Sequence, residues 1–198
     1  MSAAPRKRVA VLISGRGSNM TALIEAARAP DYPAEIVLVM SNVPEAGGLA
    51  TAQANGIATC VVDHRAFGKD REAFEHAMQD VLATYHIDIV CLAGFMRLLT
   101  PWFVGQWQGR VLNIHPALLP AFKGLDTHAR ALAAGATQHG ATVHFVVPEM
   151  DAGPIIVQGA VDVLPDDTEA TLAARVLAVE HRIYPEALRR VAEDRSKP

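Results

Sequence analysis

The chain has 198 residues, 51% of them hydrophobic and 20% charged, so its composition excludes a disordered protein and favours one packed domain. The formal net charge is -3 and the basic run 6–8 is short, which argues against nucleic acid as a partner. The apolar run at 9–13 is too short for a secretory signal, so we expect a cytoplasmic protein without membrane contact.

Short runs rich in Val and Ile alternate with helical patterns along the first half of the chain. Strands are predicted at 9–14, 35–41, 59–63, 89–93 and 110–115. This order predicts an α/β fold, a Rossmann-like and mostly parallel sheet with helices on both faces. Its interior should include Val11, Ile13, Val37, Val39, Val61, Val90, Leu92, Leu112 and Ile114.

The first predicted strand leads into a loop rich in glycine, residues 15–19, and then into a helical run. Unpaired N–H groups at the start of that helix would favour an anion, and the side chains of Arg16, Ser18 and Asn19 could add donors. A dinucleotide fingerprint would have a third glycine near Met20, and none is present. The loop therefore predicts a site for the phosphate of a small substrate or, alternatively, a tight turn without a ligand.

Residues 70–85 lie between the third and fourth strands and carry apolar side chains at spacings of three and four, which predicts a helix. Asp70 and Glu72 suit its positive amino end. After the fifth strand, residues 116–127 contain Pro and Gly and few periodic positions. A long connection is therefore expected to cover the carboxyl edge of that strand, and such loops are usually functional.

The second half of the chain predicts two more strands and a last helix. The strands are expected at 141–147 and 155–163. The helix should begin at Glu169 after a Thr168 cap, and Pro185 should break or kink it. With a tail that frays after Ala192, the chain is expected to form one domain, residues 1–198, with a core at about 7–192.

An amide, an imidazole and a carboxylate stand where two loops could converge. Alternate side chains of a strand share a face, so Asn113 and His115 should point the same way. Pro116 biases His115 away from helical dihedral angles and so indicates that the strand ends there. Asp151 follows the next predicted strand. These residue types suit acyl transfer. Alternatively, His115 could be a structural histidine, Asn113 a structural amide and Asp151 a turn residue.

Metal binding is not expected from the cysteines or the remaining histidines. Cys60 and Cys91 each lie in an apolar strand-like run without metal-type spacing, and we expect reduced thiols in the core. His139 and His144 are five residues apart, which fits neither one helix face nor a two-histidine zinc motif. His144 could help to build a pocket or be structural.

At this point a resemblance to a known family becomes specific and covers nearly the whole chain. The segments that carry it are 13–19 (ISGRGSN), 92–97 (LAGFMR), 113–116 (NIHP) with 118–120 (LLP), 139–145 (HGATVHF) and 150–154 (MDAGP). They resemble the phosphoribosylglycinamide formyltransferases, folate-dependent enzymes of purine synthesis. The sequence departs from some relatives at Arg16 and at 121–124.

The resemblance implies a transfer of the formyl group from the cosubstrate 10-formyltetrahydrofolate to the amine of glycinamide ribonucleotide. It implies catalysis by Asn113, His115 and Asp151. It also implies two sets of binding residues: Gly15, Arg16, Gly17, Ser18, Asn19 and Glu180 for the ribonucleotide, and Phe95, Met96, Arg97, Leu98, Leu99, Val147 and Asp151 for the folate. Glu180 could instead be a solvated helix charge, Met96 a core residue, and Arg16 or Arg97 a charge that faces solvent.

Two related enzyme families and one noncatalytic class of protein are the alternatives to this function. A formyltetrahydrofolate hydrolase would use water in place of the amine, and a methionyl-tRNA formyltransferase would use charged tRNA. Both carry an additional domain for which we expect no room here. A noncatalytic nucleotide-binding module is the third alternative. The sequence decides neither between a monomer and a homodimer nor whether the Leu119–Pro120 bond is cis.

Overall fold

A computed structural model describes residues 5–193, which contain a seven-stranded sheet of order β3-β2-β1-β4-β5-β6-β7. The strands are β1 (Lys7–Ile13), β2 (Ala34–Ser41), β3 (Ala58–Val61), β4 (Ile89–Leu92), β5 (Val111–His115), β6 (Gln138–Phe145) and β7 (Ile155–Asp162). The five strands from β3 to β5 in this order are parallel, whereas β6 pairs antiparallel with both β5 and β7. The predicted Rossmann-like, mostly parallel sheet is therefore confirmed.

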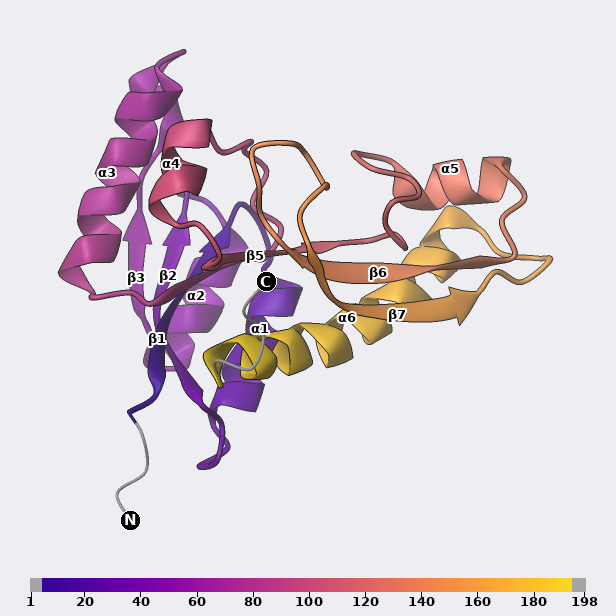
Figure 1. Ribbon diagram of the computed structural model, residues 1–198, viewed down its shortest axis with the longest axis horizontal. Coiled ribbons are helices and arrows are strands. Elements are labelled where there is room, and N and C mark those ends of the chain that lie inside the picture. The colour runs from indigo at the N-terminus through magenta and orange to yellow at the C-terminus, as the bar shows by residue number, and fades with distance from the viewer. Residues whose placement is uncertain (1–4, 194–198) are drawn as a thin grey trace.

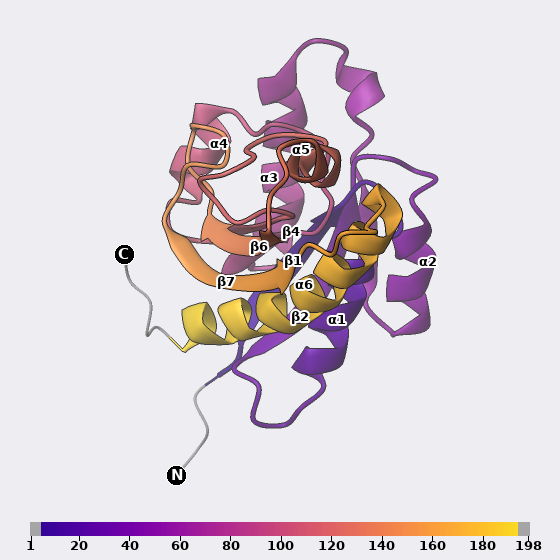
Figure 2. The same cartoon turned by 90° about the vertical axis from the view of Figure 1, so that its right-hand side faces the viewer.

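Helices cover both faces of the parallel part (Figures 1 and 2). The helices are α1 (Ser18–Ala27), α2 (Gly47–Ala54), α3 (Arg71–Thr84), α4 (Pro101–Gln106), α5 (Thr127–Ala133) and α6 (Glu169–Ala192), with a 3-10 turn η1 at His64–Phe67. Met20 of α1, Leu49 of α2 and Val176 of α6 pack into one apolar cluster. Phe74 of α3 and Phe103 of α4 pack into the other. The strands between them are apolar on both faces, as such a sheet requires.

Seven of the nine residues predicted for the sheet interior are buried, and two differ. Val61 is 41% exposed, because β3 is the edge strand of the sheet and its last residue has a neighbouring strand on one side only. Val37 on β2 is half-buried against the cluster that contains Phe74. The core thiols differ in the same way: Cys91 on the central β4 is buried, and Cys60 on the edge strand is half-buried.

The predicted helix ends are confirmed where side chains cap them. Asp70 accepts a hydrogen bond from Ala73 N at the start of α3, and Thr168 caps α6 through a reciprocal pair with Thr171. Of the break or kink predicted at Pro185, the break is wrong, because α6 continues through this residue to Ala192. The expected fraying after Ala192 falls mainly on residues 194–198, which lie outside the described residues.

The strand order reverses direction beside β1, the position at which ligands bind in folds of this kind. The chain winds outward from β1 to β2 and β3, then returns to place β4 on the other side of β1. The loops after β1 and β4 therefore separate at the carboxyl edge of the sheet, where such a fold leaves room for a ligand. The end of β5 lies at the same edge, one strand further along.

Candidate active site

The glycine loop after β1 turns sharply into α1. Gly17 has φ +69°, the left-handed region, and a Cβ there would come within 3.3 Å of the Met20 side chain. Gly48 N donates to Gly15 O at 3.0 Å, and a Cβ on Gly48 would lie 2.6 Å from Ile13 Cδ1. Glycine at 48 therefore lets α2 approach the loop closely. Gly15, Arg16 and Ser18 are exposed at the amino end of α1, where the first N–H groups of a helix have no partner within the helix.

Asn19 and Glu180 join the two ends of the chain beside the glycine loop. Both side chains are buried, and Asn19 Nδ2 donates to Glu180 Oε2 at 2.6 Å. Burial raises the pKa of Glu180, while the hydrogen bond from Asn19 lowers it. Glu180 of α6 and the glycine loop after β1 were both predicted to bind the ribonucleotide, and the structure places them side by side. The solvated-charge interpretation of Glu180 is wrong, because only 8% of the residue is exposed.

The segment after β4 presents apolar side chains at the same edge. Met96 is 67% exposed and Leu98 is 63% exposed, so the core interpretation of Met96 is wrong. Phe95, Arg97 and Leu99 alternate with them and are half-buried. Val147, the last member of the predicted folate set, is half-buried in the loop between β6 and β7. Exposed apolar groups of this size are typical of a ligand wall rather than of a closed core.

Asp151 lies between two histidines at the end of β5 and β6. Its Oδ2 is 3.5 Å from His115 Nδ1, and its Oδ1 is 3.7 Å from His144 Nε2. The side chain of Asp151 is 9% exposed, and that of His115 is 6% exposed. The predicted convergence of an imidazole and a carboxylate therefore occurs. Asp151 has φ +51°, a region that Asp tolerates better than most residues, and this conformation turns it toward the strands.

Asn113 is held by a histidine whose role the sequence leaves open. Asn113 and His144 are directly opposed in the antiparallel register of β5 and β6, and Asn113 Nδ2 lies 3.2 Å from His144 Nε2. His144 Nδ1 is 2.9 Å from the carbonyl of Phe145, which can only accept, so that nitrogen carries the hydrogen. Burial lowers the pKa of His144, so the ring is neutral at pH 7 and Nε2 accepts from the amide of Asn113.

The long connection predicted at 116–127 spans residues 116–126 in the structure, because α5 begins at Thr127, and it closes over His115. The carbonyl of Phe122 lies 2.9 Å from His115 Nε2, and Gly124 N donates to Asp151 Oδ2 at 2.9 Å. Phe122 and Gly124 both have positive φ, and the Leu119–Pro120 bond is cis. These backbone contacts were missed from the sequence, since nothing in the side chain of Phe122 signals that its carbonyl would face the imidazole.

Glycine is also required where the second loop returns to the sheet. A Cβ on Gly153 would lie 1.8 Å from Phe145 O, closer than any real contact. This close approach allows Phe145 N to donate to Pro154 O at 2.9 Å, which closes the loop that carries Asp151. Gly153 therefore allows the backbone of this loop to return close to β6, two residues after Asp151.

These features define a Rossmann-like enzyme domain in which a glycine loop at the amino end of a helix and a cluster of Asn, His and Asp side chains share one edge of the sheet. The model of the formyl transferase family matches residues 7–188. The chain belongs to the formyl transferase family.

Relatives within the family agree with this assignment. Phosphoribosylglycinamide formyltransferase of Escherichia coli is 44% identical over 189 residues, which cover 96% of this chain and 89% of that protein. The crystal structure of phosphoribosylglycinamide formyltransferase from Brucella melitensis is 56% identical with a TM-score of 0.91, covering 94% of this chain and 96% of that chain. Among the members, the chain therefore groups with the phosphoribosylglycinamide formyltransferases.

A longer relative contains the same domain. The trifunctional purine biosynthetic protein adenosine-3 of Bos taurus is 52% identical over 192 residues. This chain spans 19% of the length of that protein. Within residues 5–193 no helix is long and apolar enough to cross a membrane. The same residues contain no cluster of three or more His, Cys, Asp or Glu that could hold a metal ion.

Proposed function

We propose that the chain transfers the formyl group of 10-formyltetrahydrofolate to the amine of glycinamide ribonucleotide, as a single formyltransferase domain in the cytoplasm. The products would be formylglycinamide ribonucleotide and tetrahydrofolate. The observation that carries this proposal is the placement of Asp151 beside His115 and, through His144, beside Asn113. Membership of the family supplies the reaction class, and this cluster supplies the groups that the reaction needs.

The glycine loop is the proposed site for the phosphate of the ribonucleotide. Gly15, Gly17 and Ser18 present backbone at the amino end of a ten-residue helix, where N–H groups and the helix dipole favour an anion. Arg16 is exposed beside them and adds a positive charge. Asn19 and Glu180 would form the inner wall, with the carboxylate of Glu180 as an acceptor for ribose hydroxyl groups.

The segment 95–99, together with Val147 and Asp151, is the proposed site for the folate. Exposed Met96 and Leu98 offer an apolar surface against which a flat pterin can pack, and the backbone of an irregular segment offers hydrogen bonds to its edge. Arg97 is half-buried there and could meet a folate carboxylate. This arrangement would place the formyl group between the segment and His115.

Attack of the amine nitrogen on the formyl carbon produces a tetrahedral oxyanion. The amide N–H of Asn113, oriented by neutral His144, would donate to that oxygen as its charge grows, and His115 would be a second donor. One such donor is typically worth about 3 kcal/mol in the transition state. The Phe122 carbonyl must leave His115 Nε2 if that nitrogen is to serve as the donor.

A proton must also move from the attacking amine to the folate nitrogen that departs when the carbon–nitrogen bond breaks. Asp151 is placed to orient His115, or a water molecule between them, for this transfer. Gly124 N donates to one carboxylate oxygen and so fixes its direction. Asp151 would therefore act mainly on turnover and little on affinity.

Purified protein assayed with labelled 10-formyltetrahydrofolate would test the function directly. We expect the label in formylglycinamide ribonucleotide when glycinamide ribonucleotide is supplied, at a rate far above its release as formate. Release as formate at the same rate would indicate a hydrolase. Transfer to charged methionyl-tRNA would indicate the second alternative, and no turnover of any kind would indicate a noncatalytic module. Sedimentation of the same sample would separate a monomer from a homodimer.

A further inference from the structure

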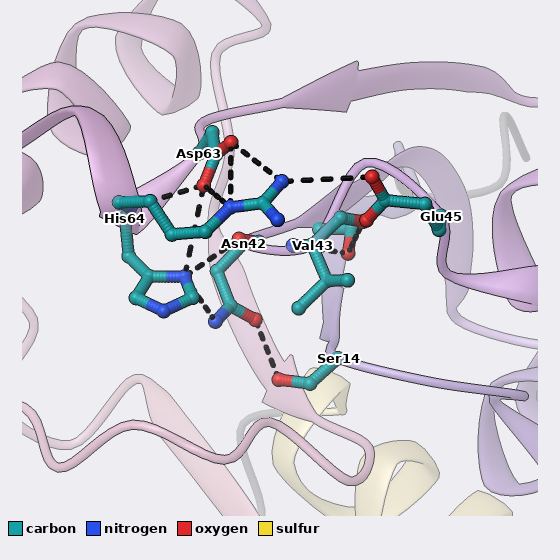
Figure 3. Close-up of polar contacts among 8 residues, drawn as sticks. Ser14, Asn42, Val43, Glu45, Asp63 and His64 are labelled. Carbon is teal, nitrogen blue, oxygen red and sulfur yellow. Dashed lines mark hydrogen bonds and ion pairs between the residues drawn. The ribbon is translucent and has the colours of Figure 1, made fainter.

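A chain of polar contacts connects three strand ends beside the proposed folate segment (Figure 3). Ser14 follows β1, Asn42 follows β2, and His64 begins the turn after β3. Ser14 Oγ donates to Asn42 Oδ1 at 2.5 Å, and Asn42 Nδ2 lies 3.2 Å from His64 Nδ1. Asn42 is 3% exposed, so this contact chain is shielded from water at its centre. The proposed mechanism uses none of these three residues.

His64 and its neighbours fix the position of Asn42. His64 Nδ1 lies 2.9 Å from the carbonyl of Asn42, which can only accept, so the imidazole donates there. The turn that carries His64 is itself fixed, because Asp63 accepts from Arg65 N at 3.0 Å. Because the hydrogen on Nδ1 is used there, His64 holds Asn42 through its backbone carbonyl, and the side chain of Asn42 is held at Oδ1 by the hydroxyl of Ser14.

Ser14 passes this orientation to the segment after β4. Its Oγ accepts from Met96 N at 2.8 Å, and its N–H donates to Gly94 O at 3.2 Å. Because the hydroxyl hydrogen is directed at Asn42, a lone pair of the same oxygen is free to face Met96 N. Ser14 therefore holds the backbone of the segment by hydrogen bonds on both sides of Phe95, at Gly94 and at Met96.

The far end of the segment has a second, independent anchor. The carboxylate of Glu75, which is 1% exposed, accepts from Thr100 N at 2.7 Å and from the hydroxyl of Thr100. Between Ser14 and Thr100, residues 95–99 are half-buried or exposed. The segment is thus a short bridge between two supports, with Met96 and Leu98 exposed and with Phe95 and Leu99 packed against the core cluster that contains Phe74.

We propose that Ser14, oriented by Asn42, is a positioning residue for the formyl donor, because it holds the Met96 backbone that shapes the folate wall. This inference rests on the proposed function, in which residues 95–99 bind the folate. It predicts a loss specific to the donor. The ribonucleotide phosphate would bind at the loop beyond Ser14, whose support comes from Gly48 and α1 instead.

The test compares Ser14→Ala with Asn42→Ala, Asn42→Asp and the wild type. Steady-state kinetics gives separate KM values for 10-formyltetrahydrofolate and glycinamide ribonucleotide, and calorimetry gives the Kd of tetrahydrofolate. In Ser14→Ala we expect the donor KM and the tetrahydrofolate Kd to rise about five- to tenfold, the range for one lost hydrogen bond. The acceptor KM should stay within about twofold of the wild-type value.

The Asn42 variants keep the test decisive if Ser14→Ala folds poorly. Asn42→Ala should raise the donor KM by a smaller factor than Ser14→Ala. In this variant Ser14 Oγ can still accept from Met96 N, but Asn42 no longer orients the hydroxyl group. Asn42→Asp keeps the oxygen that accepts from Ser14 and should restore most of the donor affinity. Gln79→Ala is the control for stability alone, since Gln79 Oε1 accepts from Trp107 Nε1 on the α3–α4 side of the sheet. It should lower Tm and leave both KM values unchanged.

The outcomes separate this inference from the function on which it rests. A wild-type donor KM in Ser14→Ala, or equal rises in both KM values, would overturn the inference and leave the function intact. If the wild type binds tetrahydrofolate but transfers no formyl group to the ribonucleotide, the function fails. The tetrahydrofolate Kd then still tests the role of Ser14: a higher Kd in Ser14→Ala than in the wild type supports it, and an equal Kd rejects it. A wild type that binds no tetrahydrofolate overturns both.

Discussion

The glycine loop after β1 and the histidine cluster after β5 share one edge of the sheet but are built in different ways. Backbone groups form the loop, supported by regular structure on every side: β1, α1 and, through Gly48, α2. The histidine cluster consists of Asn113 and His115 from β5, His144 from β6 and Asp151 from the following loop, and the second covering loop has positive φ at Phe122. One region depends on the path of the chain and the other on particular side chains.

This difference indicates how each region responds to substitution. Backbone donors remain when an exposed side chain is changed, so the glycine loop should show modest losses that appear in KM. Side chains at the cluster have no substitute, so changes there should appear in turnover. The expected effects range from large losses of turnover at the cluster to small changes in stability.

Asp151→Asn should have the largest effect. The amide keeps the shape of the carboxylate but lacks the charge that orients His115 or a water molecule for proton transfer, so turnover should fall by about 10²–10⁴-fold, the usual range for general acid–base catalysis. Both KM values should change by less than about threefold. Rapid-quench measurement of a single turnover would isolate the chemical step. Wild-type turnover would remove Asp151 from the mechanism, and a loss confined to KM would make it a binding residue.

Asn113→Ala should cost about 10²–10³-fold in turnover, the typical loss for one oxyanion donor. His144→Ala should reproduce part of this loss, because His144 Nε2 orients the amide of Asn113. Steady-state kinetics of both variants and of their double mutant would test the link. Independent, multiplying losses would contradict it.

Arg16→Ala should act on affinity alone. It removes one exposed charge beside the proposed phosphate site, so the KM for glycinamide ribonucleotide should rise about five- to tenfold. Turnover should be unchanged, and added salt should narrow the difference from the wild type. Arg28→Ala, on the far end of α1, is a matched control for the loss of charge. An unchanged KM would show that Arg16 points away from the substrate.

The smallest effect concerns stability in acid, and it should arise at His139, whose ring lies 5.9 Å from that of Phe122 in the loop over the cluster. Burial lowers the pKa of His139, behind the 116–126 loop, from 6.5 to about 4. Between these values the unfolded chain binds more protons than the folded one, so the free energy of unfolding falls as pH drops from about 6.5 toward 4. The Tm of His139→Gln should therefore fall less than that of the wild type between pH 7 and pH 5. Equal losses in thermal melts would contradict this.

The sequence predicts the strands of the parallel sheet because they are apolar on both faces and separated by turn residues. It misplaces Val61, since a pattern of apolar residues does not reveal which strand lies at the edge of the sheet. It also predicts a break at Pro185, although neighbouring elements hold α6 there: the hydroxyl of Tyr32 donates to Pro185 O at 2.7 Å. Short helices such as α4 and α5 have too few turns for a periodic pattern.

At the site, the residue types were predictable and their partners were not. Asn113 and His115 share a strand, so their common direction follows from alternation. The pairing of Asn113 with His144 depends on the antiparallel register of β5 and β6, which spacing along the chain cannot give. The contact of Asn19 with Glu180 spans most of the chain and depends on where α6 packs. The contacts of the Phe122 carbonyl and the Gly124 N–H are made by the backbone, so the residue types at these positions do not predict them.

The central claim is that His115 and Asp151 act as one unit on the migrating formyl group. A double-mutant cycle tests it most directly, with single-turnover rates of formyl transfer for the wild type, His115→Ala, Asp151→Asn and the double variant. We predict that the double variant reacts no more slowly than the slower of the two single variants, because removal of either partner already disables the pair. Losses that multiply in the double variant would show that the two residues work independently and would contradict the claim.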